Sequence, residues 1–326
     1  STAEIKKRSF SEPWRHLKAR AEMAQGHYAA ARETVEAALT QFPSSIRLRW
    51  IGHQVLRFCG AADKGQTLLT ELEQIAGANP GRYSDAANLI TLGNFYLSKG
   101  ADARQVLNVF YRPIKKRLPD YVDVYLACGA LALSKHDYQL AAEEYRRAEK
   151  LTPLNPDVHY GLARALASSQ PEQASDSLEQ ALKHNPRHVD SLLLQAHHFI
   201  DSEDYAKAVE VLDAILAVNP EQPAAWALHA VLAHLDHDAE AERKHRERAL
   251  KHWPTNPAVD LLIGRKLSQK YRFQEGAAYQ QQALKLDKTY LPAKIQLSQD
   301  LLRLGQEEEG WRLAAEVFER DGYHVV

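Results

Sequence analysis

Small apolar residues recur at a fixed interval among polar ones in the second half of the chain. One series runs through Ala148, Ala181, Ile215 and Ala249, and a second, seven residues earlier, through Ala141, Ala174, Ala208 and Glu242. A proline follows each member of the first series by five residues, at Pro153, Pro186, Pro220 and Pro254. The resulting interval of 33 or 34 residues is the period of a two-helix repeat. Small side chains let paired helices cross closely and proline ends the second helix, so the pattern predicts an array of helix pairs.

Particular motifs connect this array to a known family. The string Leu92-Gly93-Asn94-Phe95-Tyr96 and a set in a later repeat, Gly129, Ala141, Tyr145, Ala148 and Pro153, fall on positions characteristic of tetratricopeptide repeats. The chain therefore resembles the tetratricopeptide repeat family over nearly its whole length. The resemblance implies an all-α, right-handed superhelical α-solenoid of antiparallel helix pairs. About nine units are expected, with approximate spans 12–43, 46–80, 86–119, 122–153, 155–186, 189–220, 223–254, 257–288 and 291–322.

The register has weak points inside the array and at its ends. Glu242 stands at a crossing position where a small residue is expected, which suggests a looser helix pair, and Asp260 is a poor match for the bulky position of its helix. We expect a single solenoid over residues 1–326. The tail at 321–326 is apolar, whereas a solenoid normally ends in a polar cap. A further domain beyond Val326 is therefore a possibility, and the architecture resembles bacterial proteins that carry a metallopeptidase-like domain after such repeats.

In proteins of this family the first helix of each unit lines a concave groove that holds a peptide or a partner segment. Carried over to this chain, the groove positions with polar or aromatic character are Arg47, Trp50, Gln54, Arg57, Asn94, Asp123, His197, His234, Arg265, Gln299 and Arg303. Arg57 and Asn94, on neighbouring units, are expected to be able to hold an acidic group. The resemblance implies a non-catalytic protein-protein interaction scaffold. The alternative is a recruiting arm of a larger enzyme whose catalytic domain follows Val326.

Charge is unevenly distributed although the net charge is only −1. Residues 1–121 hold 18 Lys and Arg against 11 Asp and Glu. Residues 122–326 hold 23 Lys and Arg against 31 Asp and Glu. The two parts carry opposite charge, which could orient a partner or drive weak self-association that salt would screen. An uneven solvated surface explains the counts equally well.

Candidate chemistry in the chain is sparse. The densest histidines are His229, His234, His237 and His245, but the register places a turn near His237, and we expect solvated surface rather than a metal site. No phosphate loop, zinc-protease string or nucleophile elbow occurs, so we expect no cofactor and no catalytic residues. Cys59 and Cys128 lie on separate predicted helices and are expected to be buried thiols.

Basic clusters offer a further class of function, nucleic-acid binding. They lie at Lys6-Lys7-Arg8, at Arg112 with Lys115-Lys116-Arg117, and at Arg243-Lys244-His245-Arg246 with Arg248. The clusters are far apart in the sequence, and acidic residues surround the third, so solvated helix faces are the preferred interpretation. With no long apolar run and no signal-peptide core, the sequence predicts a cytoplasmic protein without a membrane span.

Overall fold

The computed structural model describes residues 11–320. The basic cluster Lys6-Lys7-Arg8 and the tail at 321–326 lie outside the described residues. Within 11–320 every regular element is helical. In chain order these elements are α2 (Glu12–Ala24), α3 (Tyr28–Gln41), α4 (Ile46–Arg57), α5 (Ala62–Ala78), η1 (Pro80–Tyr83), α6 (Ala86–Ser98), α7 (Ala103–Val106), η2 (Leu107–Tyr111), α8 (Arg112–Arg117), α9 (Val122–Ser134), α10 (Tyr138–Leu151), α11 (Pro156–Leu166), α12 (Pro171–His184), α13 (Val189–Asp201), α14 (Tyr205–Val218), α15 (Pro223–Leu235), α16 (Ala239–Leu250), α17 (Pro257–Gln269), α18 (Phe273–Leu286), α19 (Leu291–Arg303) and α20 (Glu307–Arg320).

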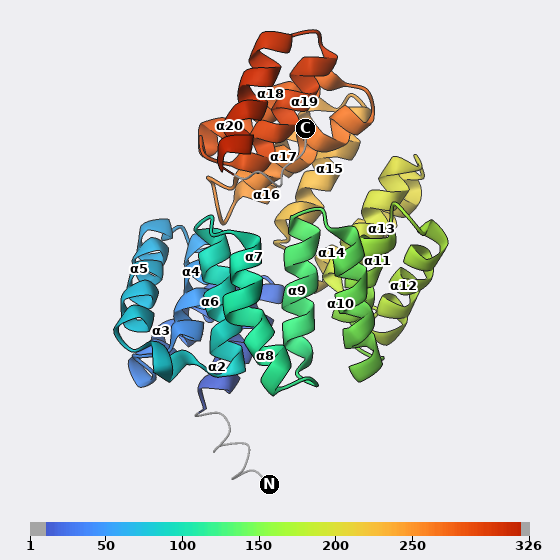
Figure 1. The fold of residues 1–326 in the computed structure, drawn as a ribbon. Helices are drawn as coiled ribbons and strands as arrows, with labels where there is room; N and C mark the ends of the chain where they lie inside the picture. The colour runs from blue at the N-terminus through green and yellow to red at the C-terminus, as the bar shows by residue number, and fades with distance from the viewer. Residues whose placement is uncertain (1–10, 321–326) are drawn as a thin grey trace. The chain divides into compact units, whose positions relative to one another are not determined.

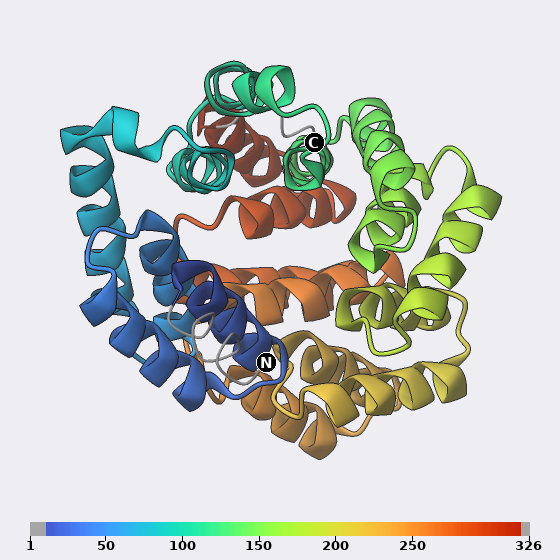
Figure 2. The same cartoon turned by 90° about the horizontal axis from the view of Figure 1, so that it is seen from below.

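The helices group by their contacts into two compact units, Ser1–Leu131 and Ala132–Val326, and the division falls inside α9. In the first unit α2 packs on α3, α4 on α5, and α6 on the segment formed by α7, η2 and α8 (Figure 1). In the second unit five further pairs follow, from α11 with α12 to α19 with α20 (Figure 2). Each unit is thus a run of helix pairs in which consecutive pairs contact each other.

Polar residues fix where the first helix of some pairs begins. The Ser45 hydroxyl accepts a hydrogen bond from the Leu48 amide at 3.1 Å, at the start of α4. Asn155 and Asn256 cap α11 and α17 in the same way, each directly before a proline. A capping side chain satisfies an amide that has no partner within the helix, and proline has no amide to satisfy. The local sequence therefore determines where the first helices of these pairs begin.

The small residues of the crossing series are buried. Ala148, Ala181 and Ile215 have no exposed surface, and Ala249 is 3% exposed. Glycine serves the same purpose on the first helices, because a Cβ atom at Gly93 would overlap the ring of Tyr111. These positions allow the backbones to approach closely, which is what the periodic pattern requires.

The second half of the third pair is not a regular α-helix. Leu107–Tyr111 form a π-helical turn between α7 and α8, and Pro113 lies at the start of α8. A proline inside a regular helix would lose one backbone hydrogen bond and clash with the carbonyl four residues earlier. The wider π-helical turn before Pro113 accommodates the proline. Within this turn, the Tyr111 hydroxyl donates a hydrogen bond to Asn94 Oδ1 at 2.9 Å. The periodic pattern did not predict this break.

Glu242 does not mark a loose helix pair, because its carboxylate is held by two partners. His234 Nδ1 lies 3.0 Å from Glu242 Oε2, and the Tyr279 hydroxyl donates to Glu242 Oε1. The misfit at Asp260 has a similar explanation: Arg246 donates to both of its carboxylate oxygens, at 2.6 and 2.7 Å. Polar contacts thus replace apolar packing around α16 and α17.

Candidate functional site

A hollow of about 370 Å³ in the first unit collects several of the predicted groove residues. We call it the α4–α6 hollow, since side chains of α4, α5 and α6 line it with the first residue after α6. Its lining residues are Trp50, His53, Gln54, Arg57, Gln66, Leu69, Thr70, Glu73, Phe95, Ser98 and Lys99. Three of the predicted residues, Trp50, Gln54 and Arg57, therefore share one concavity.

The hollow has an apolar floor. Leu69 is 8% exposed and Phe95 is 1% exposed, and both belong to a core cluster on which Trp50 packs. The Trp50 and His53 rings stack with centroids 6.3 Å apart. Because these side chains are fixed by the core beneath them, they present a preformed apolar surface to anything that enters.

The rim of the hollow is polar and carries charge of both signs. Lys99 Nζ pairs with Glu73 Oε2 at 2.8 Å and also lies 5.6 Å from the centre of the Phe95 ring. Burial lowers the pKa of His53 to about 4, and the nearby Arg57 guanidinium contributes to this lowering. At neutral pH His53 is therefore uncharged, and Arg57 supplies the positive charge beside it.

The other predicted residues of the first unit do not line this hollow. Arg47 is paired with Glu12 of α2 at 3.1 Å. Asn94 accepts the hydroxyl of Tyr111, so its carboxamide oxygen is already bonded within its own helix pair. Asp123 is exposed on α9, and it adds to the burial that raises the pKa of Tyr121. The structure thus does not bring Asn94 into the site with Arg57.

In the second unit, two predicted residues are close together. Burial lowers the pKa of His197 to about 4, with further contributions from Lys266 and Arg265. Lys266 is itself only 4% exposed and reaches Asp201 of α13 at 2.6 Å. His197 and Arg265 therefore lie near a buried lysine whose ion pair joins α13 to α17.

The remaining predicted residues of the second unit have mixed environments. His234 has Glu242 at one ring nitrogen and Glu275 at the other, so it is engaged by its own chain rather than solvated. The Arg303 guanidinium lies 5.0 Å from the centre of the Phe273 ring. Gln299 is half-buried on α19. Two of these three residues are thus engaged by side chains of other helices.

Sequence reasoning missed much of the lining of the α4–α6 hollow. Gln66, Leu69, Thr70 and Glu73 come from α5, the second helix of its pair, whereas only first helices were considered. The signal was present in the register: these residues follow the buried Gly65, which lies against His53 of the preceding helix. A groove assigned from first helices alone omits one wall.

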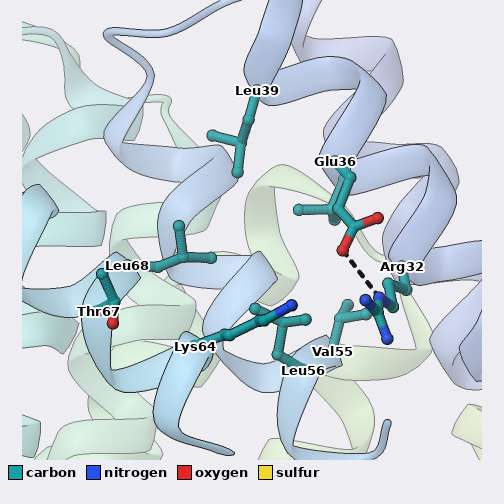
Figure 3. Close-up of a pocket in the computed structure, with 9 residues that line it drawn as sticks. Arg32, Glu36, Leu39, Val55, Leu56, Lys64, Thr67 and Leu68 are labelled. Atoms are coloured by element: carbon teal, nitrogen blue, oxygen red, sulfur yellow. Dashed lines mark hydrogen bonds and ion pairs between the residues drawn. The ribbon is translucent and has the colours of Figure 1, made fainter. Parts of the chain in front are cut away.

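A second hollow of about 250 Å³ lies between α3, α4 and α5 (Figure 3). Its lining is mainly aliphatic and includes Val35, Leu39, Val55, Leu56 and Leu68. The ion pair between Arg32 and Glu36, 2.8 Å long, flanks the hollow together with Lys64. This hollow contains none of the predicted groove residues.

Metal-binding and membrane-spanning features are both missing from the described part of the chain. Within 11–320 no group of three His, Cys, Asp or Glu side chains is arranged to hold a metal ion. Over the same range no helix has the length and apolarity needed to cross a bilayer.

The two thiols differ in exposure. Cys128 is 1% exposed, whereas Cys59 is half-buried. Burial raises the pKa of Cys59, and its Sγ atom lies 3.4 Å from the Tyr28 carbonyl oxygen.

Comparison with known proteins identifies the repeats. Two family models described as tetratricopeptide repeat match the chain, one over residues 165–232 and the other over 16–51 and 127–170. No curated protein matches the sequence. Over these residues the chain contains tetratricopeptide repeats, as the sequence motifs predicted.

Two solved structures are similar to this chain. The APC/C hetero-tetramer Cut9-Hcn1 contains a chain that is 15% identical, with a TM-score of 0.54. The alignment covers 91% of this chain and 57% of that one, so the present chain spans little more than half its length. A thermophilic TPR protein of Thermus thermophilus is 18% identical over 56% of this chain and 99% of its own, with a TM-score of 0.45. The first similarity supports an all-α solenoid of antiparallel helix pairs.

Proposed function

We propose that this chain is an interaction scaffold that binds an extended peptide segment of a partner protein, and that the α4–α6 hollow is one of its binding sites. Tetratricopeptide repeats are protein-interaction modules, which supports the scaffold assignment. The convergence of Trp50, Gln54 and Arg57 on one preformed hollow carries the assignment of the site.

The composition of the hollow indicates what such a segment would offer. Its floor of Leu69, Phe95 and Trp50 suits one apolar side chain, and about 370 Å³ is enough space for a large one. The side chains of Gln54 and Gln66 can donate to backbone carbonyls, and Arg57 can bind a carboxylate. A segment with an apolar residue next to an acidic one fits these groups.

A displayed library of short random peptides, selected on the full chain, tests the site. We expect selected peptides to bind the Arg57→Glu variant at least about ten-fold more weakly, which corresponds to about 1.4 kcal/mol. Lys64→Glu, at the second hollow, is the matched control and should leave binding unchanged. The Arg265→Glu variant identifies peptides that bind the second unit, because only their binding should become weaker.

The result that would overturn the site is equal binding by the parent chain and Arg57→Glu, with circular dichroism showing the same helix content. The sequence-based alternative, an arm that recruits substrate for an enzyme domain, uses the same kind of groove. This alternative stays a hypothesis.

A further inference from the structure

The second hollow, between α3, α4 and α5, differs from the α4–α6 hollow in position. It is bordered by α3 and α5, the second helices of two consecutive pairs, which each pack on the first helix α4 and have little contact with one another. The two hollows take different residues from α4 and α5 and share none of their lining. The second hollow is therefore a separate concavity, which the proposed peptide site does not use.

Aliphatic side chains form the inside of the second hollow. They are Val35, Leu39, Val55, Leu56 and Leu68. Val35 and Leu68 both reach the backbone of α4 at Gly52, where a Cβ atom would lie 2.8 Å from each of them. None of the nine lining residues is aromatic, so a planar ring would find no ring to stack on. The interior suits a flexible alkyl chain.

The rim of the second hollow carries an excess of positive charge. Its cationic residues are Arg32 and Lys64, and its acidic residue is Glu36. The Glu36 carboxylate is paired with Arg32 at 2.8 Å, whereas Lys64 is exposed and forms no ion pair with any residue that the structure describes. Figure 3 shows the charged ends of Arg32 and Lys64 directed toward one another. An anion between them would be attracted by both.

The corresponding position in the second unit has different chemistry. A hollow of about 360 Å³ lies there between the second helices α14 and α16 and the first helix α15. Its lining includes the aromatic rings of Tyr205, His229 and His245, and its carboxylates are those of Asp236 and Asp238. No lysine or arginine is among its lining residues. The repeat geometry therefore explains a concavity at this position, but the aliphatic interior and the cationic rim belong to the second hollow alone of the two.

We propose that the second hollow binds a small aliphatic carboxylate, with its alkyl chain among the aliphatic residues and its carboxylate at Arg32 and Lys64. Arg32 bonds Glu36 through Nε, so its two terminal nitrogens can donate to the ligand. A dry cavity of about 150 Å³ holds a six-carbon ring, so about 250 Å³ has room for roughly eight to ten non-hydrogen atoms. A carboxylate with a chain of about eight carbons therefore fits.

Octanoate is a suitable probe, because it has a chain of this length and one carboxylate. NMR titration of octanoate, labelled with ¹³C at its carboxyl carbon, with the full chain should show saturable binding with a Kd on the order of 0.1–1 mM. The Lys64→Gln variant should weaken this binding at least about five-fold, because one of the two cations is lost. Lys116→Gln, at an exposed lysine of α8, is the control with the same change of charge and should bind as the parent does.

A second ligand and a second variant separate the charge from the alkyl chain. Octanamide, which has no charge, should bind the parent at least about five-fold more weakly than octanoate, and Lys64→Gln should leave its binding unchanged. Leu39→Gln, with its helix content checked by circular dichroism, should weaken the binding of both ligands, because it places a polar amide in the aliphatic lining.

Three results would overturn the proposal. The first is the absence of saturable octanoate binding to the parent chain. The second is equal octanoate binding by the parent and Lys64→Gln, or by the parent and a folded Leu39→Gln. The third is that the selected peptides, rather than octanoate, lose affinity for Lys64→Glu, because the occupant would then be a segment of a partner protein.

Discussion

Asp260 is a charged residue inside the packed helix pairs, and its carboxylate has no exposed surface. Two hydrogen bonds from Arg246 hold it, and the ion pair stands where the repeat pattern calls for a bulky apolar residue. Such a pair contributes little net stability compared with apolar packing, but breaking it leaves a buried charge without a partner. Losing one member of the pair should therefore destabilise the fold by more than the intact pair stabilises it.

We expect Arg246→Met to lower the free energy of unfolding by about 3–5 kcal/mol, as is typical of a broken buried pair. Urea denaturation followed by circular dichroism measures this loss. Arg243→Met on the same helix is the control, because Arg243 and Glu247 form an exposed pair whose loss should cost at most about 1 kcal/mol. The double variant Arg246→Met/Asp260→Leu should recover most of the loss. Equal midpoints for the two single variants would show that the buried pair is not isolated from water.

At the scale of helices, the crossing positions decide how closely the pairs pack. Ala181 of α12 has no exposed surface, so Ala181→Trp must displace its neighbours, and we expect a loss of about 1–3 kcal/mol. Thermal unfolding should show a lower midpoint, with Ala214→Trp on α14 as the control, since Ala214 is exposed. An unchanged midpoint for Ala181→Trp would contradict the assigned register.

The sequence predicted the helix pairs well because their signals are local. Capping residues, small residues at crossings and prolines after the second helix all act within a few residues of where they stand. The turns inside the pairs were harder. Gly26, Gly60 and Gly100 have positive φ, and His136 and Tyr271 adopt the same conformation at equivalent turns without being glycine. Tertiary packing there overrides the local preference.

The candidate site was less predictable because its contacts join residues far apart in the sequence. Register alone placed Trp50, Gln54 and Arg57 on one face of α4, and the structure shows them in one hollow. The register could not show that Asn94 is hydrogen-bonded to Tyr111, or that His234 lies between Glu242 and Glu275. Those partners come from another helix, and their side-chain geometry has no periodic signal.

Across the whole molecule, both units bury histidines in a way that links stability to pH. Burial lowers the pKa of His16, His53 and His197 to about 4. In each case a nearby cation is the next cause: Arg47 for His16, Arg57 for His53 and Lys266 for His197. In the unfolded chain each ring binds a proton near pH 6.5, its ordinary value, whereas in the folded chain it does so only near pH 4. Between these values the unfolded state holds more protons, so stability falls as the pH is lowered. Asp190 and Asp300, whose pKa values burial raises, act in the opposite direction.

We therefore expect the thermal midpoint to fall steadily from about pH 7 to about pH 4.5, because the buried histidines outnumber the opposing carboxylates in this window. For His53, which is 5% exposed, the shift from 6.5 to about 4 corresponds to at most about 3 kcal/mol over the full window. His53→Gln removes the titrating group, so its midpoint should depend less steeply on pH than that of the parent, whatever its absolute stability. His27→Gln, at an exposed histidine, is the control and should keep the parental slope. Parallel pH profiles for the parent and His53→Gln would mean that His53 binds its proton equally in both states, and the acid sensitivity of the fold would then have to arise from other groups.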